Sequence, residues 1–548
     1  MRNYQLTRIL IILLVIVYFL LFLVVYTNER WSDGDEVHYL AVTSSIMKDF
    51  DLVLDNNYEN KDYFTHHSHE EKPHAYPGRY GELRPQHGIL PSIIMVPGYW
   101  LSTFCKETLG LFESNRAFLF FPRLTMLFIH IIFSLVLINF LKTLGFDKNI
   151  SILCVILYLI QLPIIIYSQA IYSDLLAGYF IMMGVFGVLL FAKTDKYKWL
   201  TSSSIFLGLT IFLHTKIIIF STLFIISSFV YLHLTFKEDD SYKISKWFKS
   251  GYYRKIAYCI LGPWLFLTAG YVLMKFYWFG SFYIDGLGDP VQKSGYLLSV
   301  IKRPFTGGII GQLLNTTIGQ TLIILIIVLF ITGLYFLIKK KKFIYLFFFV
   351  IILALAYSYK GWLGQWLDIE VGLIPNAPLL ALIFPGLFIW YRKNKPSFLL
   401  IVPSTIIYLF TKASISWYPG FCPPGRYLMI AIPVLLPALC WVLWSSRKIV
   451  WLRWIVGILT FLSIALSSLI PFVGWMGLPY SKGYNIYWRT ILNFLRLDFL
   501  EPYISLNFRK PETYYYYIGL GIFVLLLILG FYLQRKITKI EKLEEVNS

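Results

Sequence analysis

Apolar runs close to 20 residues long recur from one end of this 548-residue chain to the other. A run of this length is what an α-helix needs to cross the hydrocarbon core of a bilayer. Hydrophobic residues make up 57% of the chain and charged residues only 14%, whereas soluble domains carry about 25% charged residues. The runs lack the alternating pattern of a barrel strand, and lipid offers no partner to exposed backbone groups, so the spans must be helices. The sequence therefore predicts an all-α polytopic membrane protein.

The apolar runs give about 13–14 transmembrane helices, the count depending on whether the short pair within 199–234 forms one span or two. The candidate spans lie near 8–26, 116–141, 149–167, 175–192, 199–213, 217–234, 256–278, 319–338, 343–358, 373–391, 397–411, 426–445, 454–472 and 513–534.

Between the spans we expect a large first outer loop. The predicted organisation is a first transmembrane helix (1–26), an outer loop with an acidic motif and surface helices (27–115), a transmembrane helical body (116–472), a further outer loop (473–512), and a last transmembrane helix with a cytoplasmic tail (513–548).

The formal net charge of +19 is distributed as short Lys and Arg clusters between apolar runs, such as Lys339–Lys342 and the group Arg392, Lys393 and Lys395. Such clusters are typical of cytoplasmic loops under the positive-inside rule. A surface that binds nucleic acid would instead gather its positive charge where it can follow a phosphate backbone. We therefore expect membrane lipid around the chain and no nucleic-acid partner.

An acidic motif follows the first span, where Asp33, Asp35 and Glu36 lie within four residues between Trp31 and Tyr39. Acidic residues at a helix N-terminus complement the helix dipole and can cap the helix, which explains one or two of them. Their crowding where a span leaves the membrane also favours chemistry, because a carboxylate there could accept a proton from an acceptor hydroxyl as a general base.

Taken with later segments, this motif resembles the GT-C superfamily of membrane glycosyltransferases. The resemblance is to the protein O-mannosyltransferase and aminoarabinose transferase group, and within it to an uncharacterised bacterial branch. Six segments carry it in the same order along most of the chain: Gly34–Leu40 (GDEVHYL), Asp51–Tyr58 (DLVLDNNY), Gln86–Pro91 (QHGILP), Tyr167–Asp174 (YSQAIYSD), Leu213–Lys216 (LHTK) and Trp417–Leu428 (WYPGFCPPGRYL).

The resemblance implies a GT-C fold and a hexosyl or pentosyl transferase. Such an enzyme moves a sugar from a polyprenyl-phosphate donor to a hydroxyl of a glycan, lipid or protein acceptor, with inversion. It implies a multi-pass protein of the bacterial inner membrane whose active site faces the periplasm or exterior. The alternative is a transporter or lipid-linked sugar flippase, which would place charged residues deep in several spans.

Asp35 and Glu36 are the expected catalytic residues. The resemblance implies a second acid at Asp174, which could otherwise cap the helix that follows it. Together with His38 and His87, Asp174 is expected to position the acceptor or a cation. Two carboxylates from distant parts of the chain could hold a divalent cation or divide acceptor activation from donor positioning.

Three basic residues at predicted outer boundaries are expected to bind the donor phosphate. His214 and Lys216 interrupt an apolar stretch, where ionisable groups are costly without a partner, although a Lys there could also snorkel. Arg426 lies on the outer side against the positive-inside bias, and Arg can grip a phosphate with two parallel hydrogen bonds. An interface anchor is the alternative for Arg426.

The first outer loop holds six of the nine histidines: His38, His66, His67, His69, His74 and His87. The group His66, His67 and His69, beside Glu70 and Glu71, could bind zinc, but its spacing matches no particular site and a solvated loop explains it as well. The sequence leaves the metal unknown.

Overall fold

The computed structural model describes residues 12, 15–20, 22–23, 35–61, 74–111, 118–236, 251–280, 362–368, 372–415, 424–473, 485–500 and 514–547. The expected spans at 319–338 and 343–358 lie outside these residues, as does the histidine group at 66–69.

Six helices in the described residues are long and apolar enough to cross a membrane. They are α6 (Phe120–Thr143), α9 (Ser173–Thr194), the 3-10 turn η1 (Thr215–Ile217) continuing into α11 (Ile218–Phe236), α13 (Gly251–Phe279), α23 (Val450–Ser468) and Ile518–Glu545 of α27 (Tyr514–Asn547). The prediction of a mostly helical membrane protein is therefore confirmed.

A bent pair of helices gives a seventh candidate span. The expected span at 149–167 consists of α7 (Lys148–Leu159) and α8 (Leu162–Gln169), whose axes differ by 76°. Gln161 between them has an extended backbone, and Pro163 occupies the first turn of α8. Proline fits the first turn of a helix but cannot continue a helix, so Pro163 places the break between α7 and α8.

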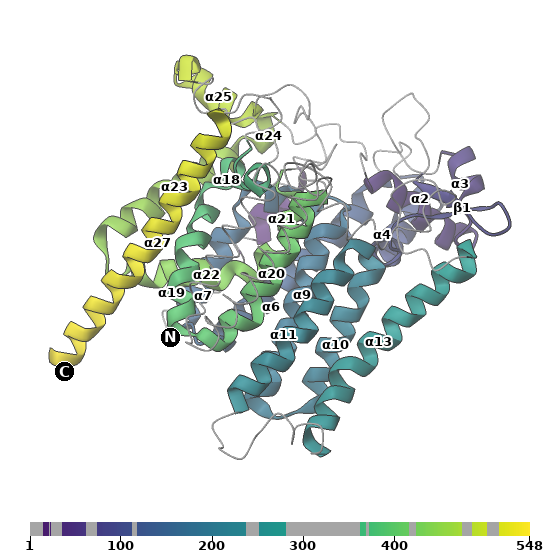
Figure 1. Cartoon of the computed structure of the whole chain (residues 1–548). Coiled ribbons are helices and arrows are strands. Elements are labelled where there is room, and N and C mark those ends of the chain that lie inside the picture. The colour runs from purple at the N-terminus through teal and green to yellow at the C-terminus, as the bar shows by residue number, and fades with distance from the viewer. Residues whose placement is uncertain are drawn as a thin grey trace, which may run out of the picture.

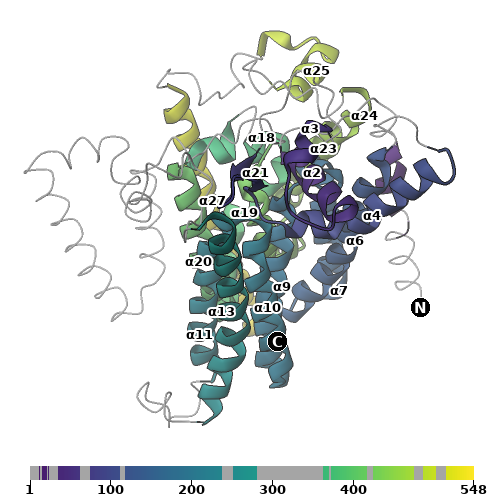
Figure 2. The ribbon, with the colours of Figure 1, turned by 90° about the vertical axis from the view of Figure 1, so that its right-hand side faces the viewer.

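Further apolar helices complete the described bundle: α10 (Tyr197–Leu213), α19 (Ile383–Lys393), α20 (Lys395–Ile415) and α22 (Ile432–Ser446). The helices α9, α10, α11 and α13 run side by side (Figure 1). At the end of the bundle away from the C-terminus lie α2 (Asp35–Lys48), α3 (Asp55–Glu59) and α21 (Arg426–Met429) (Figures 1 and 2).

The segment predicted to be the first outer loop also contains a two-stranded antiparallel ribbon, which the all-α prediction did not include. Its strands are β1 (Ala75–Pro77) and β2 (Leu83–Pro85), joined by a turn in which Gly81 has a φ of +91°. A positive φ costs glycine little, so this residue permits the tight reversal. The helix α4 (Leu90–Glu107) follows the ribbon and is not among the candidate spans in the described residues.

The end of α13 holds this ribbon in place. The ammonium of Lys275 donates hydrogen bonds to the carbonyls of Pro85 at 2.8 Å and Gln86 at 3.4 Å, and it lies 5.1 Å from the centre of the Trp278 ring. Only 4% of Lys275 is exposed. A buried ammonium needs such partners, so Lys275 fixes the backbone just before His87.

Close backbone contact brings α21 against α9. A Cβ added to Gly178 of α9 would lie 2.6 Å from the carbonyl oxygen of Met429 and 3.0 Å from that of Ile430. Any side chain at position 178 would therefore push α21 away from α9.

Gly178→Ala is expected to lower stability by about 1–3 kcal/mol, the usual cost of overpacking a tight interface. The measurement is thermal unfolding of the purified chain in detergent. Gly457→Ala is the matched control, because a Cβ at this position in α23 meets no atom within 4 Å. Equal unfolding temperatures for the two variants would contradict the tight packing of α21 on α9.

Candidate active site

Arg426 connects two carboxylates that are far apart in the sequence. Its Nη2 donates to Oδ2 of Asp35, and its Nε donates to Oδ2 of Asp174 at 3.1 Å. The Nζ of Lys216 lies 2.9 Å from Oδ1 of the same Asp174. These four residues come from α2, α9, η1 and α21, and we call them the ion cluster. All four side chains are at most 11% exposed.

Local backbone structure positions the two cations. Gly425, directly before Arg426, has a φ of +74°, a conformation that other residues rarely adopt, and α21 begins at Arg426. The guanidinium of Arg426 lies 5.3 Å from the ring centre of Tyr172, and the ammonium of Lys216 lies 5.2 Å from that of Tyr427. These cation–π contacts stabilise both charges away from bulk water.

Asp35 is ionised at neutral pH. Burial is the largest single influence and would raise the pKa of its carboxyl group, but the charges of Arg426, His87, Lys216 and His74 together outweigh the burial. Together they hold the pKa of Asp35 well below its usual range. With Asp174 also bonded to both cations, the ion cluster contains two negative and two positive groups.

The carboxylate of Glu36, the residue after Asp35, bonds to residues outside the ion cluster. Its Oε2 accepts a hydrogen bond from Arg123 Nη2 at 2.9 Å, and its Oε1 accepts one from the backbone N–H of Ile171 at 2.6 Å. Glu36 is fully buried. Its two oxygens therefore tie the start of α2 to α6 and to the segment that leads into α9.

Four histidines line the same region. His38 Nδ1 is 2.8 Å from the hydroxyl of Tyr58, and the His38 ring stacks on His74 with centroids 3.7 Å apart. His74 Nδ1 lies 3.4 Å from His87 Nε2, and the His87 ring is 5.2 Å from that of His214. His214 in turn accepts a hydrogen bond from the backbone N–H of Lys216 at 3.3 Å and so caps η1.

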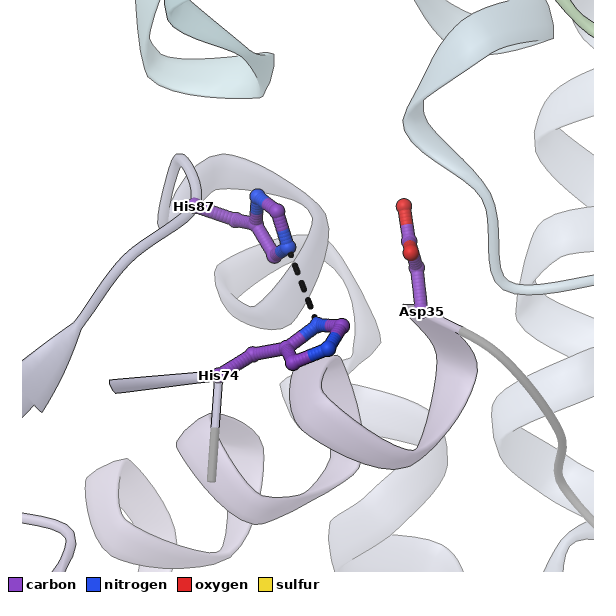
Figure 3. Close-up of side chains that lie close together, drawn as sticks. All are labelled: Asp35, His74 and His87. Atoms are coloured by element: carbon purple, nitrogen blue, oxygen red, sulfur yellow. Dashed lines mark hydrogen bonds between the residues drawn. The ribbon is translucent and has the colours of Figure 1, made fainter. Parts of the chain in front are cut away.

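The carboxylate of Asp35 lies close to two of these histidines, His74 and His87. Figure 3 shows the rings of His74 and His87 facing the carboxylate of Asp35 at the start of α2. One ligand atom from each residue lies within 4.8 Å of the other two. Burial lowers the pKa of His87 most, and the nearby Asp35 offsets part of this, leaving a pKa of about 4 and a neutral ring at pH 7.

The structure thus places the residues singled out in the sequence in one region. The ion cluster contains Asp35, Asp174, Lys216 and Arg426, while His38, His87 and His214 lie around it. Arg123 and the contact of His74 with Asp35 were not foreseen. Arg123 could have been found from the reasoning applied to Arg426, because it too is an Arg at the predicted outer end of a span.

Part of the chain matches a known protein family. Residues 103–278 match the family model "Dolichyl-phosphate-mannose-protein mannosyltransferase". This segment contains Arg123, Asp174, His214 and Lys216. Over about a third of its length the chain is therefore similar to that family of lipid-phosphate-mannose-dependent glycosyltransferases. The expected relationship to the protein O-mannosyltransferase group, and the expected enzyme class, are confirmed at this level.

A solved structure provides a second comparison. The apo form of the Archaeoglobus fulgidus oligosaccharyltransferase aligns with 90% of this chain at 12% sequence identity and a TM-score of 0.36. The alignment covers 59% of that enzyme, so this chain spans less than two thirds of its length. No protein of curated function matches the chain by sequence.

Removing Arg123 should destabilise the chain strongly, because it removes the guanidinium that is paired with the buried carboxylate of Glu36. For Arg123→Met we expect a loss of about 3–5 kcal/mol, and a smaller loss when Glu36→Gln is added, since the carboxylate charge is then gone. Thermal unfolding of both single variants and the double variant measures this coupling. Arg447→Met is the control, because the Arg447–Asp147 pair is about half exposed and should contribute at most about 1 kcal/mol. Additive effects of the two substitutions would contradict the pairing.

Proposed function

We propose that this chain transfers a single sugar from a polyprenyl-phosphate carrier to an acceptor hydroxyl on the outer face of a bacterial inner membrane, with inversion at the anomeric carbon. The ion cluster carries this proposal. It places two cations and two carboxylates, nearly closed to solvent, at the end of the bundle where a lipid phosphate would lie.

Arg426 and Lys216 are suited to bind the donor phosphate. Their charges lie in a poorly screened environment, where electrostatic stabilisation of a leaving group is worth more than in water. Arg can form parallel hydrogen bonds to phosphate, and Lys adds a compact point charge. His214 caps the turn that contains Lys216, and its ring lies beside that of His87.

Asp35 acts on the hydroxyl group of the acceptor. As the acceptor oxygen forms its bond to the anomeric carbon, the bond from that carbon to the phosphate oxygen breaks, and the phosphate leaves with the electron pair. The acceptor hydroxyl loses its proton, which Asp35 accepts directly or directs to solvent by orienting the hydroxyl. A single displacement of this kind inverts the configuration.

Asp174 and Glu36 act through their neighbours in this scheme. Asp174 keeps Arg426 and Lys216 close together despite their like charges. Glu36 was expected to be catalytic, but its bonds to Arg123 and Ile171 suit a positioning residue that aims Asp35 at Arg426. His38, whose ring stacks on His74, supports the acceptor side of the site.

Asp35→Asn is expected to abolish sugar transfer while leaving the chain folded, because the amide keeps the size of the side chain but cannot take a proton. The assay follows loss of label from a panel of radiolabelled polyprenyl-phosphate sugars in membranes that contain the chain. Asp498→Asn, the same change at an exposed position, is the control and should retain full activity. Full activity of Asp35→Asn would exclude Asp35 from catalysis. No loss of label with the wild-type chain across an adequate panel would favour a transporter or flippase instead.

Arg426→Lys tests the donor side. Lysine keeps the charge, but its N–H groups all lie on one nitrogen, so it cannot reproduce the planar fork by which Arg426 bonds Asp35 and Asp174 from two nitrogens. We expect kcat to fall by about 10²–10³, as when one preorganised donor is removed from a transition-state site. A change in KM with an unaltered kcat would show that Arg426 contributes to binding alone.

A further inference from the structure

We propose that Asp35, His74 and His87 bind one transition-metal ion of the Zn²⁺ type beside the ion cluster. Metal binding itself does not depend on the activity proposed above, whereas the role given to the metal below does. The site differs from the expected one, in which two carboxylates hold a hard divalent cation, because two of its three ligands are imidazoles.

The distances suit a metal centre. Two zinc–nitrogen bonds of about 2.0–2.1 Å at a tetrahedral angle place their nitrogens about 3.4 Å apart. His74 Nδ1 and His87 Nε2 are 3.4 Å apart, which is long for a hydrogen bond. Ligand atoms of Asp35, His74 and His87, one from each residue, lie within 4.8 Å of one another, so a modest side-chain movement completes the set.

The ligand types select the metal. Imidazole nitrogens suit zinc, copper, iron and nickel, whereas magnesium and calcium prefer shells made of oxygen. Two histidines and one carboxylate also leave a tetrahedral zinc ion one open position, as in catalytic rather than structural zinc sites. An acceptor hydroxyl is the kind of ligand that could occupy it.

The ligands are held by surrounding structure. Lys275 fixes the carbonyls of Pro85 and Gln86 just before His87, and the ring of His38 stacks on His74. Asp35 is the first residue of α2, which Glu36 anchors to α6. Such neighbours orient metal ligands in advance and raise affinity for the ion.

Asp35 can serve the metal and Arg426 together. A carboxylate has two oxygens with about four lone-pair positions, and Arg426 bonds to Oδ2, which leaves Oδ1 for the ion. The ion cluster is neutral, so a dication would give the site a charge of +2. If the proposed transfer is correct, this charge complements the leaving phosphate, whose own charge is about −2.

The test is metal content. The full-length chain, purified in detergent with a tag free of histidine, is incubated with Zn²⁺, freed of unbound metal by gel filtration, and analysed by mass spectrometry for zinc. We expect about one zinc per chain, and at least about tenfold less in His74→Asn and in His87→Asn, each of which loses a ligand. Asparagine keeps a polar side chain, and unchanged unfolding temperatures without metal would show that both variants fold.

A triple variant distinguishes this site from the other histidine group. His66→Ala, His67→Ala and His69→Ala together should retain the zinc, and zinc should raise the unfolding temperature of this variant as it does for the wild type. The proposal is overturned if the wild-type chain retains no zinc, or if zinc is lost in the triple variant and kept in His74→Asn and His87→Asn. Sugar transfer by a zinc-free wild type would reject the role given to the metal in transfer and leave the proposed function standing. Zinc binding without transfer would reject the function and leave the metal site.

Discussion

A guanidinium buried between two carboxylates is the interaction on which the site depends. Taking charged groups out of water costs several kcal/mol for each ion, and the hydrogen bonds of Arg426 to Asp35 and Asp174 offset this cost. Each partner belongs to a different element, α2, α9 or α21. The geometry of one side chain therefore fixes the relative positions of three parts of the chain. Gly425 and Gly178 serve the same arrangement, because they let the backbone of α21 reach its place.

Two adjacent acids in α2 serve two different networks. Consecutive residues of an α-helix point about 100° apart, so Asp35 and Glu36 cannot face the same partner. Asp35 faces Arg426 and the histidines, while Glu36 faces Arg123 and the backbone of Ile171. The bond of Glu36 to Arg123 holds the start of α2, which orients Asp35 toward Arg426. The two adjacent acids are thus paired with two different cations.

The sequence predicted best those residues that would be energetically costly at their positions without a partner or a function. Long apolar runs predicted the helices, and the charges that interrupt or border them, Asp174, His214, Lys216 and Arg426, proved to lie together. Partner choice was not predictable, because neither the bond of Glu36 to Arg123 nor the approach of His74 to Asp35 leaves a local signal. Both depend on how segments about 40 to 90 residues apart pack. The ribbon was missed for a similar reason, since three-residue strands are too short to show a period of two.

The separation of Asp35 and Arg426 along the chain also determines when the ion cluster can form during translation. Their bond spans 391 residues, which a ribosome adds in roughly 20 to 80 s at about 5–20 residues per second. During that time α2 has already left the ribosome while its cation has not been made. The pair between Asp35 and Arg426 can form only after α21 has been synthesised. A chain interrupted before residue 426 would contain both carboxylates and still be unable to assemble the ion cluster.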